Sequence, residues 1–288
     1  MKDLNHQLMK LCRQNRDGSY STQATRSRIL DLIANQLHAL GFRHMRPASL
    51  KPKHVDGLIA HWQEQGISTG TLKNRLSVLR WWAKKVNRQS VMRRDNTAYG
   101  IGPKTCVAKI SKALMLDNNK LAQVNDEYIR MSVRLQAAFG LRREESIKFQ
   151  PLYAMQGDHI KLKSSWTKGG RPRTVPITNE GQRRLLAEVR VLARGGALIP
   201  PQLNYVEQLH RYERLTRKAG LFRLHGLRHD YAQRRYLELT GLVCAVGGGL
   251  SSKEQNPEQR ALDYEARVIV SRELGHSREA ISAAYLGR

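Results

Sequence analysis

The apolar residues in the first third of the chain recur every three or four positions, which is the spacing of one face of an α-helix. Three such runs occupy residues 22–40, 53–65 and 68–82, and a glycine follows each of the first two. At the start of the third run, Ser68 offers the side-chain oxygen of a helix-capping residue. The sequence therefore predicts a short helical bundle in this part of the chain.

The rest of the chain combines helical patterns with one strand-like region. Residues 119–149 have helical periodicity, which resumes from residue 179, whereas residues 159–163 and 174–177 alternate between apolar and polar side chains. Glycine and proline around these two segments favour a small hairpin or a three-stranded sheet. The predicted fold class is mainly α with a small β-sheet, an α+β arrangement.

Glycine and proline residues, which break helices and strands, mark a boundary that divides the 288 residues into two predicted domains. We expect an N-terminal extension at 1–19, a helical domain at 20–95, a linker at 96–115 and a second domain at 116–288. Within the second domain, residues 241–262 contain three successive glycines and a polar run, which is typical of a mobile inserted loop.

Both parts of the chain are strongly basic. Residues 1–100 hold 18 basic and 6 acidic side chains and residues 101–288 hold 32 and 18, which gives a formal net charge of +26. Such a surface indicates a polyanionic partner, with nucleic acid first and an anionic membrane surface second. A basic protein of the ribosomal kind is the alternative that charge alone leaves open. Basic side chains between the apolar positions of residues 68–82 suit the phosphates of a duplex, although a solvated helix face has the same pattern.

Cysteine usage and hydropathy limit the class of protein further. The three cysteines are far apart and form no Cys-x-x-Cys pair, which is typical of a protein in a reducing cytosol. The N-terminus lacks an apolar signal core, and no apolar run approaches the roughly 20 residues that a membrane span needs. We expect a cytoplasmic, nucleoid-associated protein with no membrane partner.

Four separate segments could act on a phosphodiester without metal. We find no carboxylate triad of the kind that holds Mg²⁺ ions, so no metal site is predicted. A metal-free route would use arginine to hold phosphate oxygens and histidine or lysine to transfer protons. The segments are Gly140-Leu141-Arg142 with Glu145, a glycine-rich turn with Lys168, His225-Gly226-Leu227-Arg228-His229, and Leu274-Gly275-His276 followed by Tyr285. Each alone has a structural explanation, such as a buried ion pair for Arg142 and Glu145.

In order and spacing, these four segments resemble the tyrosine recombinase family, which includes the phage integrases and the Xer-type recombinases. The resemblance covers about residues 20–288, and the helical region resembles the family's core-binding domain. It implies a two-domain DNA clamp, with a core-binding domain at 20–95 and a catalytic domain at 116–288. It also implies site-specific recombination or integration of double-stranded DNA, as in mobile genetic elements, by a tetramer on paired sites. No cofactor, metal or ATP would be needed.

The resemblance implies a role for each site residue. Tyr285 would attack the scissile phosphate and form a 3′-phosphotyrosyl link, while Arg142 and Arg228 would hold the non-bridging oxygens. Glu145 would support these arginines. Lys168 would protonate the departing 5′-oxygen. The remaining predictions are His225 and His276 as phosphate or proton-transfer groups, and Lys73, Arg75, Arg80, Lys84, Arg171 and Arg173 as DNA contacts.

Two departures from the family accompany this resemblance. The gap from Arg228 to Leu274 is about twice what the family leads us to expect, and residues 241–262 account for the excess. The chain stops three residues after Tyr285, so we expect either that protomers assemble through another surface, with the insert as the candidate, or that the polypeptide is truncated. Two alternatives stay open: a type IB topoisomerase-like nicking-closing enzyme, and a catalytically silent DNA-binding regulator of the same fold.

Overall fold

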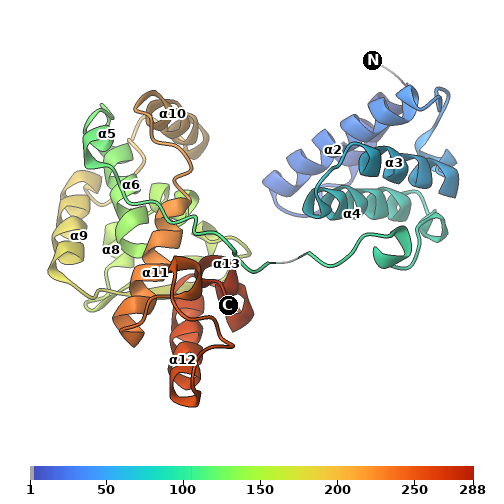
Figure 1. Cartoon of the computed structure of the whole chain (residues 1–288). Helices are drawn as coiled ribbons and strands as arrows, with labels where there is room; N and C mark the ends of the chain where they lie inside the picture. Colours follow the sequence, from blue (N-terminus) through green and yellow to red (C-terminus); the bar gives the residue numbers. More distant parts are fainter. Residues whose placement is uncertain (1–2, 105) are drawn as a thin grey trace. The chain divides into compact units, whose positions relative to one another are not determined.

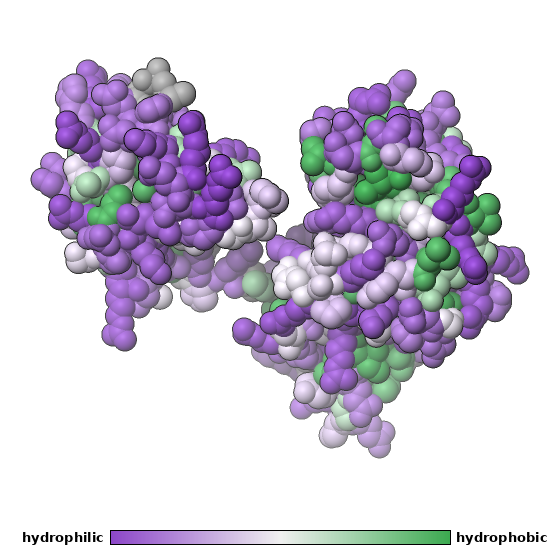
Figure 2. Space-filling model, turned by 180° about the vertical axis from the view of Figure 1, so that it is seen from behind, coloured by the Kyte–Doolittle hydropathy of each residue, from purple (hydrophilic) through white to green (hydrophobic). Residues whose placement is uncertain are grey.

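The structure, a computed structural model, describes residues 3–104 and 106–288. Contacts divide the chain into two compact units at residues 105 and 106 (Figure 1). This boundary lies within the linker expected at 96–115. Hydrophilic side chains cover most of the face of both units that Figure 2 shows. No helix in the described ranges is long and apolar enough to cross a membrane.

The first unit is a helical bundle, as the sequence predicts. Its elements are α1 (Asp3–Gln14), α2 (Tyr20–Ala39), η1 (Pro47–Ser49), α3 (Pro52–Glu64), α4 (Thr69–Lys85), η2 (Gln89–Val91) and η3 (Thr97–Tyr99). Ser68 caps α4 by accepting a hydrogen bond from the backbone N–H of Thr71 at 3.4 Å. The core includes Trp62 and Trp82, both fully buried. The three helices predicted from apolar spacing are all present.

The first unit is larger than its predicted boundaries. Leu4 and Leu8 of α1 are buried in the same core as α2, so α1 is part of the bundle and not a separate N-terminal extension. At the other end, Tyr99 and Ile101 also belong to this core, although both fall in the expected linker. The apolar positions of these two segments are part of the bundle because they cover surfaces of α2, α3 and α4 that would otherwise face water.

The second unit is mainly helical and holds a small antiparallel hairpin. Its elements are α5 (Asn118–Ala122), α6 (Glu127–Phe139), α7 (Arg143–Ile147), α8 (Pro151–Ala154), β1 (His159–Leu162), η4 (Ser164–Trp166), β2 (Arg173–Pro176), α9 (Glu180–Ala193), α10 (Tyr205–Lys218), α11 (Gly226–Thr240), η5 (Ala245–Gly247), α12 (Pro257–Glu273), η6 (Glu279–Ser282) and α13 (Ala283–Leu286). Strands β1 and β2 pair with Ile160 opposite Val175. Of the two predicted arrangements, a hairpin and a three-stranded sheet, the structure has the hairpin. In the described residues, one isolated bridge, between Met155 and Ile160, lies beside it.

The core of the second unit forms around α6, which packs against both α9 and α11. Leu135 and Phe139 of α6 are fully buried there. Figure 1 shows α11, α12 and α13 gathered at one end of the unit, and contacts link α11 with both of the others. The last three α-helices of the described chain are therefore packed together, with α11 in contact with the other two.

Residues 241–262 have more structure than the loop that we expected. They contain η5 and the first turn of α12, which begins at Pro257 with Asn256 as its cap. The backbone N–H groups of Gly247 and Gly249 both donate to the carbonyl of Cys244. A Cβ at Gly249 would overlap the carbonyl of Val243, so the turn needs glycine at that position.

Candidate active site

The first arginine of the site stands at a sharp break between two helices. Helix α6 ends at Phe139, and Gly140 turns the chain with a φ of 59°. A Cβ at Gly140 would lie 2.5 Å from Cδ1 of Tyr231, so both its backbone angle and its surroundings require glycine. Arg142 then caps α7, and its backbone N–H donates to Glu145 Oε2 at 2.6 Å.

Glu145 is a fully buried carboxylate held by two arginines. Arg173 donates to it with both terminal nitrogens, at 2.6 and 2.7 Å, and Arg142 Nη1 donates at 2.8 Å. Burial by itself would raise the pKa of Glu145, but the hydrogen bonds and charge of Arg173 outweigh this, and the pKa falls to about 2. The carboxylate is therefore ionised at neutral pH and fixes two guanidinium groups.

The structure corrects the prediction that Arg173 lies on the DNA-facing surface. Its side chain is buried, it pairs with Glu145, and its Nε donates to the carbonyl of Glu273 at 2.8 Å. Gly275 allows this packing, since a Cβ there would lie 2.9 Å from Cδ of Arg173. Arg173 thus belongs to the interior of the site, where it holds Glu145 in place.

Arg228 of α11 is the most buried cation of the site, at 1% exposure. It donates to the carbonyls of Gly140 and Leu274, and the Leu274 carbonyl also accepts from Arg142 Nη2 at 3.3 Å. Burial, opposed by the nearby Tyr285, lowers the pKa of Arg228 to about 10, so it stays protonated at neutral pH. Two predicted arginines are therefore brought together around one carbonyl oxygen.

The phenol of Tyr285 lies against this cation. Its oxygen accepts from Arg228 Nε at 3.4 Å and lies 3.4 Å from Nε2 of His276. Its ring is 4.6, 5.7 and 6.4 Å from the rings of His229, His276 and His225, measured between centroids. Of the predicted site residues, the structure thus brings Arg142, Glu145, Arg228, His225, His276 and Tyr285 together.

The imidazoles around the phenol favour their neutral forms. Burial and the charges of Arg228 and Arg142 lower the pKa of His276 to about 4, and burial likewise lowers the pKa of His225. The pKa of His229 also falls to about 4, chiefly through burial. Its Nδ1 is buried without a hydrogen-bond partner among the described residues. The sequence reasoning did not select His229, although it lies four residues after His225 and hence on the same helix face.

Lys168 takes no part in the contacts that join the other predicted site residues. It is exposed in the turn between η4 and β2, where Gly169 and Gly170 have φ values of 83° and 67°. Within the described part of the chain it makes no hydrogen bond or ion pair. The described residues also contain no group of three or more His, Cys, Asp and Glu side chains placed to hold a metal ion.

Comparison with known proteins decides the family. Residues 1–92 match the family model described as phage integrase, N-terminal, and residues 101–234 match the model described as integrase. The tyrosine recombinase XerC of Pseudomonas syringae pv. syringae (strain B728a) is 26% identical over 206 residues, which are 64% of this chain and 67% of that protein. The chain belongs to the tyrosine recombinase family.

Solved structures of tyrosine recombinases share the fold. The XerH site-specific recombinase bound to a palindromic difH substrate has a TM-score of 0.58 at 18% identity, over 99% of this chain and 81% of that chain. A lambda integrase dimer bound to a COC′ core site has a TM-score of 0.58 at 12% identity, over 98% and 94%. The chain is a tyrosine-type site-specific DNA recombinase, so neither the topoisomerase nor the silent regulator is favoured. It spans about two thirds of the length of the curated relatives that it matches.

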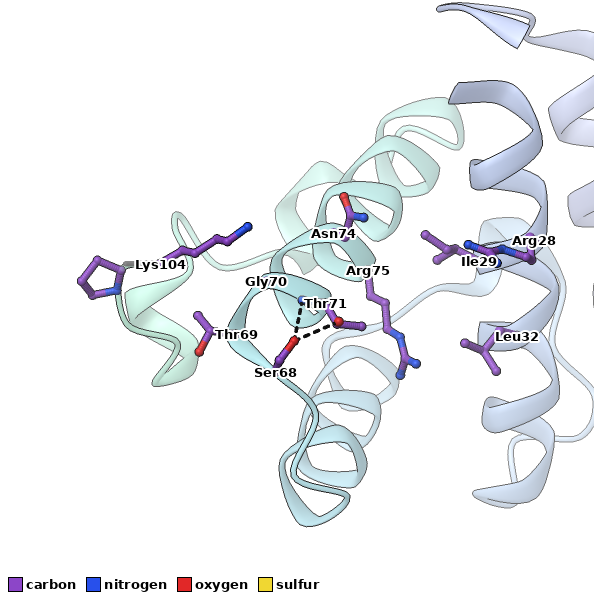
Figure 3. Close-up of a pocket in the computed structure, with 11 residues that line it drawn as sticks. Arg28, Ile29, Leu32, Ser68, Thr69, Gly70, Thr71, Asn74, Arg75 and Lys104 are labelled. Atoms are coloured by element: carbon purple, nitrogen blue, oxygen red, sulfur yellow. Dashed lines mark hydrogen bonds between the residues drawn. The ribbon is translucent and has the colours of Figure 1, made fainter. Parts of the chain in front are cut away.

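The first unit of this recombinase has a basic hollow beside the start of α4. The cavity measures about 1000 Å³ and is lined by Arg28 of α2, Arg75 and Asn74 of α4, and Lys104. Figure 3 shows Arg28 and Arg75 on facing elements, with the capping Ser68 hydrogen-bonded to Thr71 nearby. Arg75 also lies over the ring of Trp62, at 5.2 Å from its centroid, and one of its terminal nitrogens is buried without a hydrogen-bond partner in the part of the chain described.

The other predicted DNA contacts differ in their exposure to solvent and in their hydrogen bonds within the protein. Arg80 is held by Asn96, to which it donates at 2.8 Å, so its guanidinium is partly committed within the first unit. Lys84 and Arg171 are exposed, and Lys73 is half-buried.

Proposed function

We propose that this recombinase cleaves and rejoins DNA through a covalent bond between Tyr285 Oη and a 3′-phosphate. The observation that supports it is the position of the Tyr285 oxygen, 3.4 Å from both Arg228 Nε and His276 Nε2. A phenol needs a proton acceptor and a stabilised transition state before it can attack phosphorus at neutral pH, because its pKa is near 10 in water. A neutral imidazole and a guanidinium beside the oxygen meet these two needs.

The reaction exchanges one phosphodiester bond for another. The Tyr285 oxygen forms a bond to phosphorus and gives up its proton, for which His276 is the nearest imidazole acceptor. The bond from phosphorus to the 5′-oxygen breaks, and that oxygen takes a proton from Lys168. Religation reverses both transfers, and because the phosphotyrosyl link conserves the bond, neither ATP nor metal is needed.

The two arginines would act on the charge that develops at phosphorus. Arg142 and Arg228 converge on the Leu274 carbonyl, and the arrangement is held by the buried Glu145. A phosphate placed between them would find two planar forks already oriented, which is where electrostatic stabilisation is most effective. We assign Glu145 and Arg173 the task of keeping these forks in position.

Lys168 would have to approach the site as DNA binds. Its turn is exposed, and the two residues after Lys168 are glycines with left-handed backbone angles. Because glycine has no Cβ, the backbone of this turn can change conformation at little steric cost. Arg171 in the same turn would contact the backbone of the duplex.

The first unit would hold the other side of the duplex. Arg28, Arg75 and Lys104 around the start of α4 form a hollow whose chemistry suits phosphate: cations, an amide at Asn74, and a helix N-terminus. Lys73 and Lys84 extend this surface along α4, and Arg80 contributes from the position that Asn96 gives it.

Assembly and location are proposals of the same kind. One relative is a lambda integrase tetramer bound to a Holliday junction. We propose that this recombinase likewise acts as a tetramer on paired sites, in the cytoplasm and on the chromosome. We also retain 116–288 as the catalytic domain.

The direct test is covalent trapping from a library. Nicked duplexes with a randomised central region are incubated with the protein in excess EDTA, and protein–DNA adducts are isolated under denaturing conditions and sequenced. We expect adducts with a shared sequence and a 3′-phosphotyrosyl bond. Adducts that form only when Mg²⁺ is restored, or none with any sequence, would contradict the proposal. Efficient relaxation of plasmids that lack the recovered site would favour a topoisomerase instead.

A further inference from the structure

The segment that leads into the second unit is attached to the helix of the nucleophile. The backbone N–H of Ala108 donates to the carbonyl of Ala283, the first residue of α13, at 2.9 Å. Six residues further on, the N–H of Leu114 donates to the carbonyl of Gly226 at the start of α11, at 3.1 Å. Residues 108–114 thus contact both helices that face the phosphate site.

Gln233 of α11 joins the same three elements with one amide. Its Nε2 donates to the backbone carbonyl of Tyr285 at 3.1 Å and lies 3.0 Å from the hydroxyl of Ser111. The hydroxyl of Ser111 in turn lies 3.2 Å from Gln233 Oε1 and accepts from the N–H of Ala113 at 3.2 Å. The glutamine therefore links the nucleophile's own backbone to the segment 108–114.

Helix α13 depends on such contacts for its position. It has four residues, which is too short to be stable by its own hydrogen bonds. Its other attachments include the buried Leu286 and the hydrogen bond from Arg267 Nη1 to the carbonyl of Gly287, at 2.9 Å. The Gln233 contact is the side-chain hydrogen bond that reaches the carbonyl of Tyr285 itself.

We propose that Gln233 is a positioning residue for strand cleavage: together with Ser111, it fixes the Tyr285 backbone and so sets the distance of the phenol from Arg228. The inference rests on the proposed role of Tyr285. It adds that the placement of the nucleophile depends on residues 108–114, the stretch of the second unit that follows its junction with the first. A shift of this segment would move α13, and an error of about 1 Å at a reacting group can cost 10²-fold in rate.

The test uses substitutions that separate the hydrogen bond of Gln233 to the Tyr285 carbonyl from its hydrogen bond to Ser111. Gln233→Met keeps the size of the side chain and loses both hydrogen bonds, whereas Ser111→Ala removes only the bond to the segment. Leu237→Gln, at an exposed position on the same helix, is the matched control. Two readouts are measured on each full-length variant: amide hydrogen exchange of residues 281–288 without DNA, and the rate of covalent adduct formation at saturating duplex.

For Gln233→Met we expect exchange in 281–288 to rise roughly 10-fold and the cleavage rate to fall roughly 10-fold, with duplex affinity within about 2-fold of the parent. Ser111→Ala should change both in the same direction by about 3-fold, and Leu237→Gln should change neither. Gln233→Asn, whose shorter amide cannot reach both partners, should not rescue the rate.

Unchanged exchange and rate in Gln233→Met would overturn the inference, as would faster exchange with an unchanged rate. If Gln233→Met does not fold, Ser111→Ala alone tests the inference. In that case, unchanged exchange and an unchanged cleavage rate in Ser111→Ala would overturn the proposed coupling of Tyr285 to residues 108–114. Hydrogen exchange needs no cleavage, so failure of the proposed chemistry, seen as adducts that persist without the Tyr285 hydroxyl, is distinguishable from failure of this inference.

Discussion

Arg142 and Arg228 donate to the same backbone oxygen, the carbonyl of Leu274, two residues before His276. The residues are 86 positions apart, one at the cap of α7 and the other in α11, so the Leu274 carbonyl is a fixed point at which two positive charges meet. Two guanidinium groups that share one carbonyl acceptor repel each other, and the negative charge of the buried Glu145 offsets that repulsion. The site is thus arranged to hold positive charge where a phosphate would sit.

Replacement of Arg142 should affect the rate far more than binding. Arg142→Ala keeps the backbone N–H that caps α7 and removes the guanidinium, so the transition state loses a partner for its developing charge. We expect the rate of adduct formation to fall on the order of 10² to 10³-fold, with a small change in duplex affinity. Arg142→Lys should recover little, because an ammonium cannot reproduce the planar fork.

Arg143→Ala is the internal control for this experiment. Arg143 is adjacent in sequence but exposed, and its Nη1 pairs with Glu213 at 2.7 Å. Its loss should cost little in rate. Equal losses at the two positions would mean that the phosphate is not held by Arg142.

Arg173 should contribute to stability in a way that Arg171 does not. Arg173→Met leaves the buried Glu145 without the two hydrogen bonds that Arg173 donates, whereas Arg171 is exposed. Breaking a buried ion pair typically costs about 3–5 kcal/mol. We expect a loss of that order in the free energy of unfolding for Arg173→Met and almost none for Arg171→Met, measured by urea denaturation. Similar values for both would place Arg173 on the surface, as the sequence first suggested.

The neutral histidines should make the protein less stable as the pH falls from about 6.5 to about 4. The pKa values of His276 and His229 are lowered to about 4 in the folded state from 6.5, so the unfolded chain binds protons first in this range. Stability therefore rises with pH there and is fully present above about 6.5. His276→Asn should flatten this part of the curve, measured as the free energy of unfolding against pH. An unchanged slope would show that His276 is not buried among cations.

Below that range the carboxylate of Glu145 should add a second decline. Its pKa is lowered from 4.5 to about 2, so its contribution is present above pH 4.5 and is lost as the pH falls towards 2.

Salt dependence should reveal the role of the hollow in the first unit. If Arg75 neutralises one phosphate, Arg75→Ala should reduce the slope of log K against log[salt] by about 0.9. Arg13→Ala, an exposed arginine at the end of α1 outside the hollow, is the control. The measurement is duplex affinity at several salt concentrations. An unchanged slope in Arg75→Ala would mean that this cation serves only its contact with Trp62.

Much of the site could be predicted from sequence because its residues stand in four short segments of fixed internal spacing. The His225 and Arg228 pair is an example, since a three-residue spacing places both on one helix face. The pairing of Arg173 with Glu145 could not be predicted, because it depends on how β2 packs against α7, 28 residues away. Arg173 alone has the same sequence signal as the exposed Arg171.

Two misjudged elements did have a local signal. Leu4, Leu8 and Leu11 of α1 have helical spacing, and the burial of Leu4 and Leu8, with Leu11 partly buried beside them, shows that this short pattern was part of the bundle. Asn256-Pro257 is a helix start, with a capping residue followed by proline at the first helical position, and it cuts the expected loop short. The spacing of His229 from His225 was a local signal, but its contact with the ring of Tyr285, 56 residues later, could not be predicted from that spacing.

The most direct test of the account is Tyr285→Phe on a nicked duplex that carries the site recovered by covalent trapping. The substitution removes one hydroxyl and no cation, and the ring still packs against His229. On a denaturing gel, we expect the parent protein to give a covalent protein–DNA band and the Phe variant to give none, while native gels show duplex binding nearly unchanged. A covalent band that survives in Tyr285→Phe would contradict the account and assign the nucleophile to another residue.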